Sequence, residues 1–257
     1  MAFSIGVEFD HAIDWSKRLD QEIPFLRAWL KSWNARLVVD MACGSGRHCV
    51  ALAAQGFRMT GVDSDLLMLA AASRHALVQG LSVDPEAAAG SAVFLSGDLR
   101  RTPTLERQDA VLCLGNSLCL LADRDEVLQA LRSFHALLPT KGGIILHLLN
   151  YTRFQDPAHA FFPLKTDLEN GRPRRHYLKM IEHKGGEAIV HLVLIEEEAG
   201  QWSRRVKSDR LLILEATDLQ ELVLRAGFGE VQIYGSLKGE LFHQESHDVV
   251  LCARARC

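Results

Sequence analysis

The chain has 257 residues, of which 48% are hydrophobic and 24% are charged, so it can bury a sizeable core and is not a disordered segment. Its 29 Lys and Arg residues nearly balance its 32 Asp and Glu residues, which leaves a formal net charge of -3 at pH 7. Such a balance gives no long-range attraction for nucleic acid or for an anionic membrane surface. We therefore expect a protein that acts on a small molecule.

The six cysteines contain no C-x-x-C pair, which excludes the spacing of zinc ribbons and dithiol redox motifs, and we predict no bound metal. The first ten residues lack a basic flank followed by an apolar core, so they are not expected to form a signal peptide. No apolar run reaches the ~20 residues that a membrane helix needs. We expect a reduced, cytoplasmic protein that is a monomer or a homodimer.

In chain order, apolar residues at helical spacing predict a first helix over residues 16–33, bent or staggered at Pro24. Short apolar runs then alternate with helical patterns. The predicted strands are 36–41, 58–63, 92–96, 110–114 and 144–149, and the predicted helices are 47–55, 65–79 and 125–138. This alternation predicts a parallel sheet with right-handed crossovers and helices on both faces.

Residues 150–216 interrupt the alternation. Three strand-like runs separated by glycine turns, at 177–181, 188–195 and 211–214, predict an antiparallel meander. Thr217 is then expected to cap a helix that ends near Gly227, and two last strands follow at 231–234 and 249–252.

These elements together predict an α/β, Rossmann-like fold with a seven-stranded, mostly parallel sheet. Residues 1–149 and 217–257 would form the cofactor-binding domain. Residues 150–216 would form an inserted antiparallel β subdomain that covers the pocket as a substrate lid.

The first predicted strand ends in Asp40 and leads into Gly44-Ser45-Gly46 at the start of a helix. Glycines let a ligand approach the backbone closely, and a helix N-terminus offers free N–H groups. Taken alone, a G-x-G turn is as typical of a tight strand-to-helix connection as of a ligand site.

Other predicted strands also end in polar residues. Asp63 ends the second strand, where a carboxylate can accept both hydroxyls of a ribose, although a helix N-cap is the alternative role. Asp98 follows the third strand, and Asn116 follows the fourth. Because ligands of open α/β sheets bind outside the carboxyl ends of the strands, we expect these side chains to meet at one nucleotide site.

Two positions favour S-adenosylmethionine (SAM) over a dinucleotide. The dinucleotide fingerprint has a Gly or Ala three residues after its second glycine, and here that residue is the bulkier Cys49. Asp40 has no role in a dinucleotide turn, whereas it suits the ammonium group of the methionine end of SAM.

With these motifs the chain resembles the class I SAM-dependent methyltransferases, and within them the glycine N-methyltransferase-like group. The resemblance covers nearly the whole chain. It rests on Asp40 to Gly46, on Val62-Asp63-Ser64, on the strand that ends in Asn150-Tyr151, and most specifically on Cys113-Leu114-Gly115-Asn116-Ser117.

The resemblance implies roles for the matching residues. SAM would be held at its methionine part by the glycine loop and the fourth strand, at its ribose by the second strand, at its adenine by the third, and at its carboxylate by the N-terminal helix. The residues are, in that order, Ala42, Gly44, Gly46 and Leu114, then Asp63 and Ser64, then Asp98 and Leu99, then Arg18.

Asn116 would face the substrate, and His147 and Tyr151 are the further candidates for the catalytic end. Packing in the core is the alternative for His147, and a surface or packing role is the alternative for Tyr151. For Arg18 the alternative is a solvated helix arginine.

One position departs from the group that the chain resembles. Glycine N-methyltransferases carry an arginine directly before the matching Asn-Tyr, where it holds the glycine carboxylate, and this chain has Leu149 there. The departure predicts that glycine is a poor substrate and that the acceptor is larger or lacks a carboxylate at that position. An arginine from Arg172–Arg175 that swings in is the alternative source of the charge.

We predict a methyltransferase that moves the methyl group of SAM to a small-molecule amine nitrogen and leaves S-adenosylhomocysteine (SAH). The alternatives are an O-methyltransferase, which would need a base such as His147 or Tyr151, and a SAM-binding regulatory protein without turnover. No Asn/Asp-Pro-Pro-Tyr/Phe motif follows the fourth strand, which disfavours a nucleic-acid methyltransferase.

Overall fold

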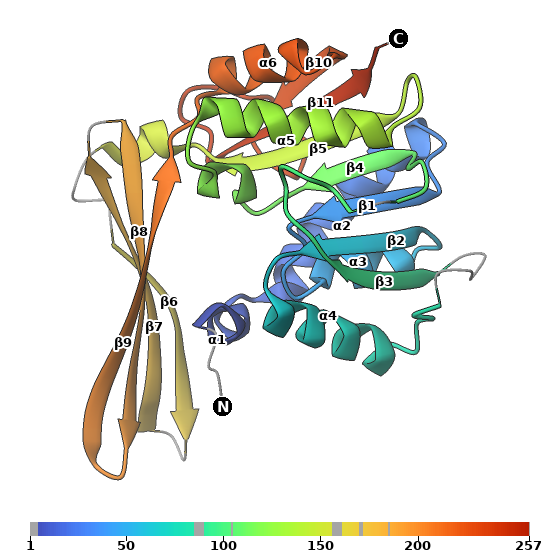
Figure 1. The fold of residues 1–257 in the computed structure, drawn as a ribbon. Helices are drawn as coiled ribbons and strands as arrows, with labels where there is room; N and C mark the ends of the chain where they lie inside the picture. The colour runs from blue at the N-terminus through green and yellow to red at the C-terminus, as the bar shows by residue number, and fades with distance from the viewer. Residues whose placement is uncertain are drawn as a thin grey trace.

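The protein is described from a computed structural model that places residues 5–84, 90–103, 105–155, 161–169, 172–184 and 186–256. Two sheets organise the molecule (Figure 1). One has seven strands in the order β10-β11-β5-β4-β1-β2-β3, and the other has four in the order β6-β7-β8-β9. The predicted α/β fold, with a mostly parallel sheet and an antiparallel β insertion after the fifth strand, is confirmed.

Five adjacent strands of the larger sheet, from β5 to the edge strand β3, are parallel, and β11 and β10 at the other edge are each antiparallel to their neighbours. The strand order reverses between β1 and β4, which makes their carboxyl ends the switch point at which open α/β sheets bind ligands. The parallel strands are β1 (Leu37–Met41), β2 (Arg58–Asp63), β3 (Ser91–Ser96), β4 (Ala110–Cys113) and β5 (Gly143–Leu149), and the others are β10 (Phe228–Tyr234) and β11 (Asp248–Ala255).

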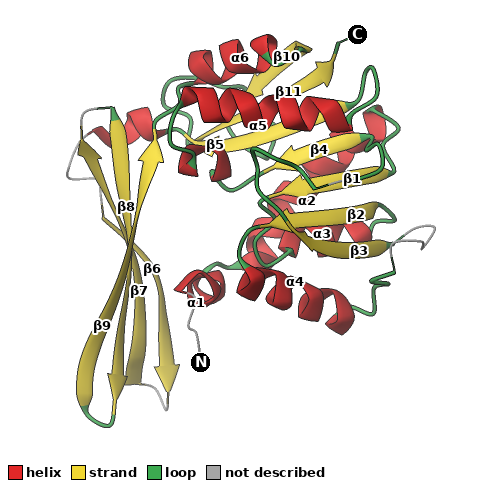
Figure 2. Ribbon diagram, in the orientation of Figure 1, coloured by secondary structure: helices red, strands yellow, loops and turns green. Residues whose placement is uncertain are grey.

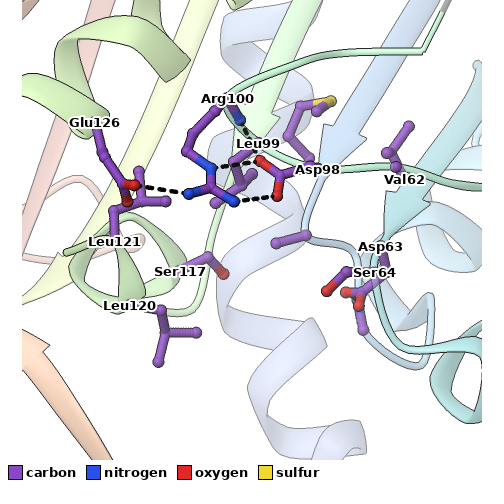
Figure 3. Close-up of a pocket in the computed structure, with 14 residues that line it drawn as sticks. Val62, Asp63, Ser64, Asp98, Leu99, Arg100, Ser117, Leu120, Leu121 and Glu126 are labelled. Atoms are coloured by element: carbon purple, nitrogen blue, oxygen red, sulfur yellow. Dashed lines mark hydrogen bonds and ion pairs between the residues drawn. The ribbon is translucent and has the colours of Figure 1, made fainter.

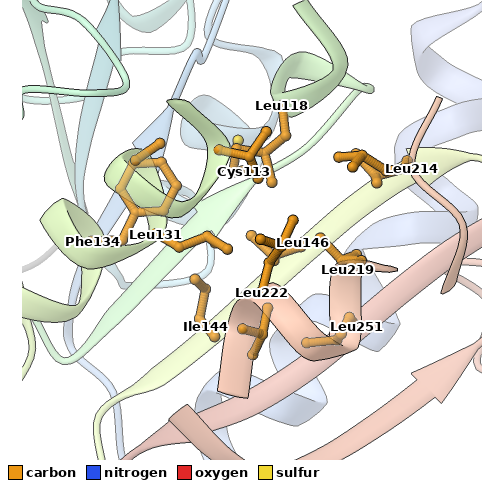
Figure 4. Packing of buried hydrophobic residues seen from close by; sticks show 14 of the residues in the cluster. Cys113, Leu118, Leu131, Phe134, Ile144, Leu146, Leu214, Leu219, Leu222 and Leu251 are labelled. Atoms are coloured by element: carbon orange, nitrogen blue, oxygen red, sulfur yellow. The ribbon is translucent and has the colours of Figure 1, made fainter. Parts of the chain in front are cut away.

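Helices cover both faces of this sheet (Figure 2). One face packs against α2 (Trp15–Ser32), α3 (Arg47–Ala53) and α4 (Leu66–Val78), with Leu26 and Leu52 fully buried there. The other face packs against α5 (Arg124–Leu137) and α6 (Ala216–Arg225), where Phe134 and Leu222 meet the strands (Figure 4). The sheet is therefore buried on both sides, as the near-continuous apolar strands predict.

The N-terminal and C-terminal helices differ from the prediction in detail. A short helix, α1 (Ile5–Ala12), precedes α2 and was not predicted. Pro24 lies inside α2 without ending it. The prediction that Thr217 caps α6 is wrong, because α6 begins at Ala216 and the backbone N–H of Glu215 instead donates to the carboxylate of Asp218, at 3.3 Å.

The smaller sheet, called the lid sheet below, has four long antiparallel strands where the sequence predicted three shorter ones. No strand was predicted at β6, and β9 extends back from the predicted strand at 211–214 through a polar segment for which none was predicted. The four strands are β6 (Phe161–Glu169), β7 (Arg172–Lys184), β8 (Glu187–Glu198) and β9 (Gln201–Leu212). Within the part of the chain that the structure describes, no helix combines the length and apolarity that a membrane span requires.

Candidate functional site

A cavity of about 410 Å³ opens at the carboxyl ends of β1, β2 and β3, beside the short 3-10 helix η1 (Ser117–Leu120). Figure 3 shows the side chains that surround it. Six of the ten residues predicted to hold the cofactor line this cavity: Ala42, Gly44, Asp63, Ser64, Asp98 and Leu99. Arg18, Asp40, Gly46 and Leu114 lie outside its lining.

The turn after β1 lines the cavity with backbone. Ala42 and Gly44 both have positive φ, at 61° and 55°, so the chain turns sharply there and leaves its backbone open to a ligand. A Cβ on Gly46, which also has a positive φ, would lie 2.7 Å from both Ala72 and Phe94. Gly46 thus lets the loop pack against α4 and β3 instead of lining the cavity.

Asp63 is held in a fixed orientation at the end of β2. Its Oδ2 accepts a hydrogen bond from the backbone N–H of Gly44 at 2.7 Å, and its Oδ1 accepts one from the backbone N–H of Asp65 at 2.9 Å. The N-cap of α4 is Asp65, so the alternative role for Asp63 falls to its neighbour. Each oxygen of Asp63 keeps a lone pair for a ligand hydroxyl.

Asp40 is 2% exposed, and its Oδ1 has no hydrogen-bond partner among the described residues. Its Oδ2 accepts only a weak hydrogen bond from the Cys49 thiol, 3.6 Å away. Burial, together with the nearby charge of Asp63, raises the pKa of Asp40 to about 7. A cation bound in the site would supply the partner that this carboxyl lacks.

Asp98, predicted to meet the adenine, is already engaged by Arg100. Its Oδ1 accepts hydrogen bonds from the backbone N–H and Nε of Arg100, and its Oδ2 accepts one from Nη2 at 2.7 Å. These hydrogen bonds lower the pKa of Asp98 to about 2. Arg100 and Glu126 also line the cavity, and neither was singled out from the sequence, because no local pattern shows that they meet.

The N-terminal helix α1 contacts the glycine loop through Asp10, which is 6% exposed. Asp10 accepts hydrogen bonds from the Ser45 hydroxyl, from the guanidinium of Arg47, and from the indole N–H of Trp15. The sequence offered no signal for this contact, since α1 itself was not predicted. The loop is therefore held by an element far from it in the chain.

Arg18 lies on α2 and does not line the cavity. Its Nε donates to Glu22 at 2.8 Å, and its guanidinium lies over the ring of Trp15. Glu22 also contacts the buried His48 at 2.6 Å, and these partners outweigh burial and hold the pKa of Glu22 below its usual value. Contact between Arg18 and a cofactor carboxylate stays a prediction.

Asn116 and Tyr151 contact each other. The side-chain amide of Asn116 donates to the Tyr151 hydroxyl at 2.9 Å, and its carbonyl accepts from the backbone N–H of Leu149 at 3.1 Å. Asn116 also has a positive φ of 75°. Burial raises the pKa of Tyr151 well above its usual value, so its phenol stays protonated at neutral pH. Leu114 is buried in the hydrophobic core.

His147 has one ring nitrogen hydrogen-bonded and the other close to a carboxylate. Its Nδ1 accepts a hydrogen bond from the backbone N–H of Gly115 at 3.2 Å, so the ring proton lies on Nε2. That Nε2 lies 3.4 Å from Oδ1 of Asp248, which also contacts His247 at 2.8 Å. Although burial acts the other way, these contacts hold the pKa of Asp248 below its usual value.

Lys179 of the lid sheet is a charged residue close enough to Asp248 to interact with it. It lies two residues from each of the buried residues Tyr177 and Ile181 along β7, so it shares their face of the strand. Its register partners are Phe162 and Leu192. Burial lowers the pKa of Lys179 to about 8. The sequence analysis did not single it out.

In the segment 172–175, Arg174 and Arg175 are paired within the lid sheet. Arg174 forms an ion pair with Glu197, and Nε of Arg175 lies 3.5 Å from Glu196. Leu149 has the predicted place at the end of β5, opposite Asp248 in β11. The side chain of Arg172 lies outside the described residues.

Several known proteins are similar to this chain. Residues 38–142 match the model of a methyltransferase domain. The chain is 34% identical to the glycine/sarcosine N-methyltransferase of Parasynechococcus marenigrum over 152 residues, which are 59% of this chain and 51% of that protein. It is 25% identical to the enzyme of the same name from Aphanothece halophytica over 254 residues, 94% of this chain and 84% of that protein. The chain thus spans about half the length of the first relative and most of the second.

Solved structures share the fold. A SAM-dependent methyltransferase from Clostridium acetobutylicum superimposes with a TM-score of 0.79 at 13% identity, over 99% of this chain and 100% of the other. A sugar N-methyltransferase from Streptoalloteichus superimposes with a TM-score of 0.76 at 18% identity, over 100% and 94%. Both similarities extend through the lid sheet, because they cover nearly the whole chain.

Proposed function

We propose that the chain is a class I SAM-dependent methyltransferase and that it transfers the methyl group of SAM to an amine nitrogen of a small molecule. Its matches to a methyltransferase domain and to glycine/sarcosine N-methyltransferases support this. The predicted cofactor, SAM, agrees with this family. The relatives named above act on glycine and sarcosine or on sugars, and the acceptor of this chain is the open part of the proposal.

The cavity at the strand ends is the observation that carries the proposal. Ala42 and Gly44 present backbone there and Asp63 presents a fixed carboxylate. Oδ1 of the buried Asp40, which lies outside the cavity lining, lacks a hydrogen-bond partner among the described residues. This donor set fits SAM, since a ribose suits Asp63 and an ammonium group suits Asp40. When bound, SAM supplies a methyl group that its positive sulfur has already activated. The chain then has to align the acceptor and exclude water.

An amine acceptor is favoured over a hydroxyl because neither candidate base is available. Nδ1 of His147 already accepts the backbone N–H of Gly115, its Nε2 carries the ring proton, and Tyr151 stays protonated. A hydroxyl acceptor would need one of them to remove its proton, whereas a neutral amine needs no strong base. We assign His147 to positioning Asp248, and Asn116 to the substrate end of the site.

The charges near the acceptor end suggest how an amine would be chosen. Leu149 offers no guanidinium, and Arg174 and Arg175 are already paired in the lid sheet. Among the described residues, the carboxylate of Asp248 lies opposite Leu149, and the amine of Lys179 is close enough to interact with it. Asp248 would bind an ammonium or amine, so we expect glycine to be outcompeted by a bulkier amine that also fills the apolar surroundings.

Binding is tested first by thermal unfolding with SAM, SAH or NAD. SAM and SAH should raise the melting temperature, because a ligand that binds only the native state stabilises it, and NAD should not. A shift with NAD and none with SAM or SAH would refute the cofactor assignment.

Turnover is tested with methyl-labelled SAM and a pool of metabolites, followed by mass spectrometry. A labelled N-methyl product supports the proposal, a labelled O-methyl product supports the second candidate, and binding without any product supports a regulatory protein. Competition among glycine, sarcosine and bulkier amines then ranks the acceptors. Efficient glycine turnover that is lost in Arg174→Ala or Arg175→Ala would show that a lid arginine holds the carboxylate.

A further inference from the structure

Arg100 has no role so far, although it lies in the wall of the cavity. It follows β3 by four residues, at the end where the adenine of a nucleotide cofactor is expected. Figure 3 places its guanidinium between Asp98 on one side and Glu126 on the other, with Leu99, Ser117 and Leu121 around it.

The guanidinium is fixed by two carboxylates from different elements. Nε and Nη2 donate to the two oxygens of Asp98, at 2.9 and 2.7 Å, and Nη1 donates to Glu126 at 2.6 Å. Glu126 is itself held, because its other oxygen accepts the backbone N–H of Ala122 at 3.0 Å. Three of the five guanidinium N–H groups are thus used along the edge of the plane.

A guanidinium held in this way offers mainly its flat face to a ligand. Asp98, in turn, has both of its oxygens engaged by Arg100 and is a poorer acceptor for a further amino group. The residue that the sequence assigned to the adenine therefore contacts Arg100 instead, and Arg100 contacts the cavity.

We propose that Arg100 is the adenine-binding residue of this site, with its guanidinium plane stacked on the adenine ring and with Asp98 and Glu126 as the residues that position it. The inference rests on the proposed function, since it takes the adenine of SAM as the occupant. A planar, weakly hydrated guanidinium stacks on flat aromatic rings, including bases, whereas a lysine ammonium does not offer a plane.

The experiment measures the affinities of SAH and of S-inosylhomocysteine, in which the 6-amino group of the base is an oxo group, by titration calorimetry. Arg100→Met should weaken both ligands by roughly 5- to 30-fold, the range expected for losing a stacked cation. Arg100→Lys should weaken both nearly as much. Asp98→Asn should weaken both by the same factor, because it loosens Arg100 without touching the base.

The matched control is Arg124→Met. Arg124 starts α5 two residues before Glu126, pairs with Asp218 at 2.6 Å, and does not line the cavity. It should bind SAH like the unaltered protein, and all variants should keep their unliganded melting temperature within a few degrees. A variant that melts much earlier is replaced by Glu126→Gln, which frees one edge of the guanidinium and should weaken both ligands less than Arg100→Met does.

Two results would overturn the proposal. One is an unchanged SAH affinity in a folded Arg100→Met. The other is an Asp98→Asn variant that loses the discrimination between the two ligands while Arg100→Met keeps it, since Asp98 would then read the amino group directly. If the unaltered protein binds neither ligand, the proposed function fails instead, so the two failures are distinguishable.

Discussion

The two sheets of the molecule differ in how far their strands are buried. In the larger sheet, β4 is buried at every position and β5 at all but its last. In the lid sheet, β8 alternates between buried and half-buried positions and β9 is exposed over most of its length. Ligand-facing residues of the larger sheet are fixed by backbone hydrogen bonds, whereas the charged residues of the lid sheet mostly pair with one another.

From this comparison we expect the cavity end of the larger sheet to be preformed and intolerant of change, while the lid sheet can vary. A strand buried on both faces keeps its register and its end residues in place. A sheet with one exposed face accepts substitutions on that face at little cost. Relatives with different acceptors share this architecture, as expected if specificity lies in the lid.

Paired glycine substitutions should give the largest contrast. Gly46→Ala places a Cβ 2.7 Å from Ala72 and Phe94 at a φ of +70°, so we expect a loss of about 3–5 kcal/mol in the free energy of unfolding. Gly200→Ala, in the β8–β9 turn, has a φ of +80° but an empty surrounding and should lose only about 1 kcal/mol. Urea unfolding measures both, and equal losses would contradict the difference between the regions.

Removal of the Asp63 carboxylate should be next in size. Asp63→Ala is expected to weaken SAM binding by ~1.5–3 kcal/mol, because charge-assisted hydrogen bonds to the ligand are lost. The control is Asp65→Ala, which removes the N-cap of α4 and should cost about 1 kcal/mol of stability without a comparable loss of affinity. Calorimetry that finds unaltered SAM affinity in folded Asp63→Ala would refute the ribose assignment.

Lys179 tests whether a partly buried charge destabilises the lid sheet. Its pKa of about 8 in the folded protein is below the usual 10.5, so between these values the unfolded chain binds more protons and stability should rise with pH. Lys179→Met should remove that rise and stabilise the protein at pH 7 by roughly 1–3 kcal/mol. Lys207→Met, which removes an exposed lysine paired with Asp209, should do neither in unfolding curves recorded from pH 7 to 10.

The smallest effect concerns the proton on Asp40. With a pKa of about 7, this carboxyl is roughly half protonated at pH 7 in the unliganded protein. A bound ammonium group favours the carboxylate, so SAH binding should release up to about half a proton and should tighten as the pH rises through 7. Calorimetry in buffers of different ionisation enthalpy counts that proton, and Asp40→Asn should release none; equal release from both proteins would exclude Asp40 as its source.

Local patterns in the sequence determined the frame of the molecule. The alternation of apolar strands with amphipathic helices predicted β1 to β5 and the helices between them nearly to the residue, because buried parallel strands and one-sided helices have periods that a single segment displays. The same holds for the residues that follow β1 and β2 and line the cavity: Ala42, Gly44, Asp63 and Ser64. Topology brings strand ends together without help from any particular side chain.

Tertiary structure alone decided which side chains meet. The edge strand β6 is held by its pairing with β7 and contains Pro163, so no periodicity showed it. β9 is polar and exposed at consecutive positions along most of its length, so it shows no apolar alternation. Arg100 pairs with Asp98 and with Glu126, His147 contacts Asp248, and Asp10 holds the glycine loop. Most of these partners lie 26 to 101 residues apart in the chain, a separation at which sequence pattern carries no information, and only packing of the whole fold selects the pairs.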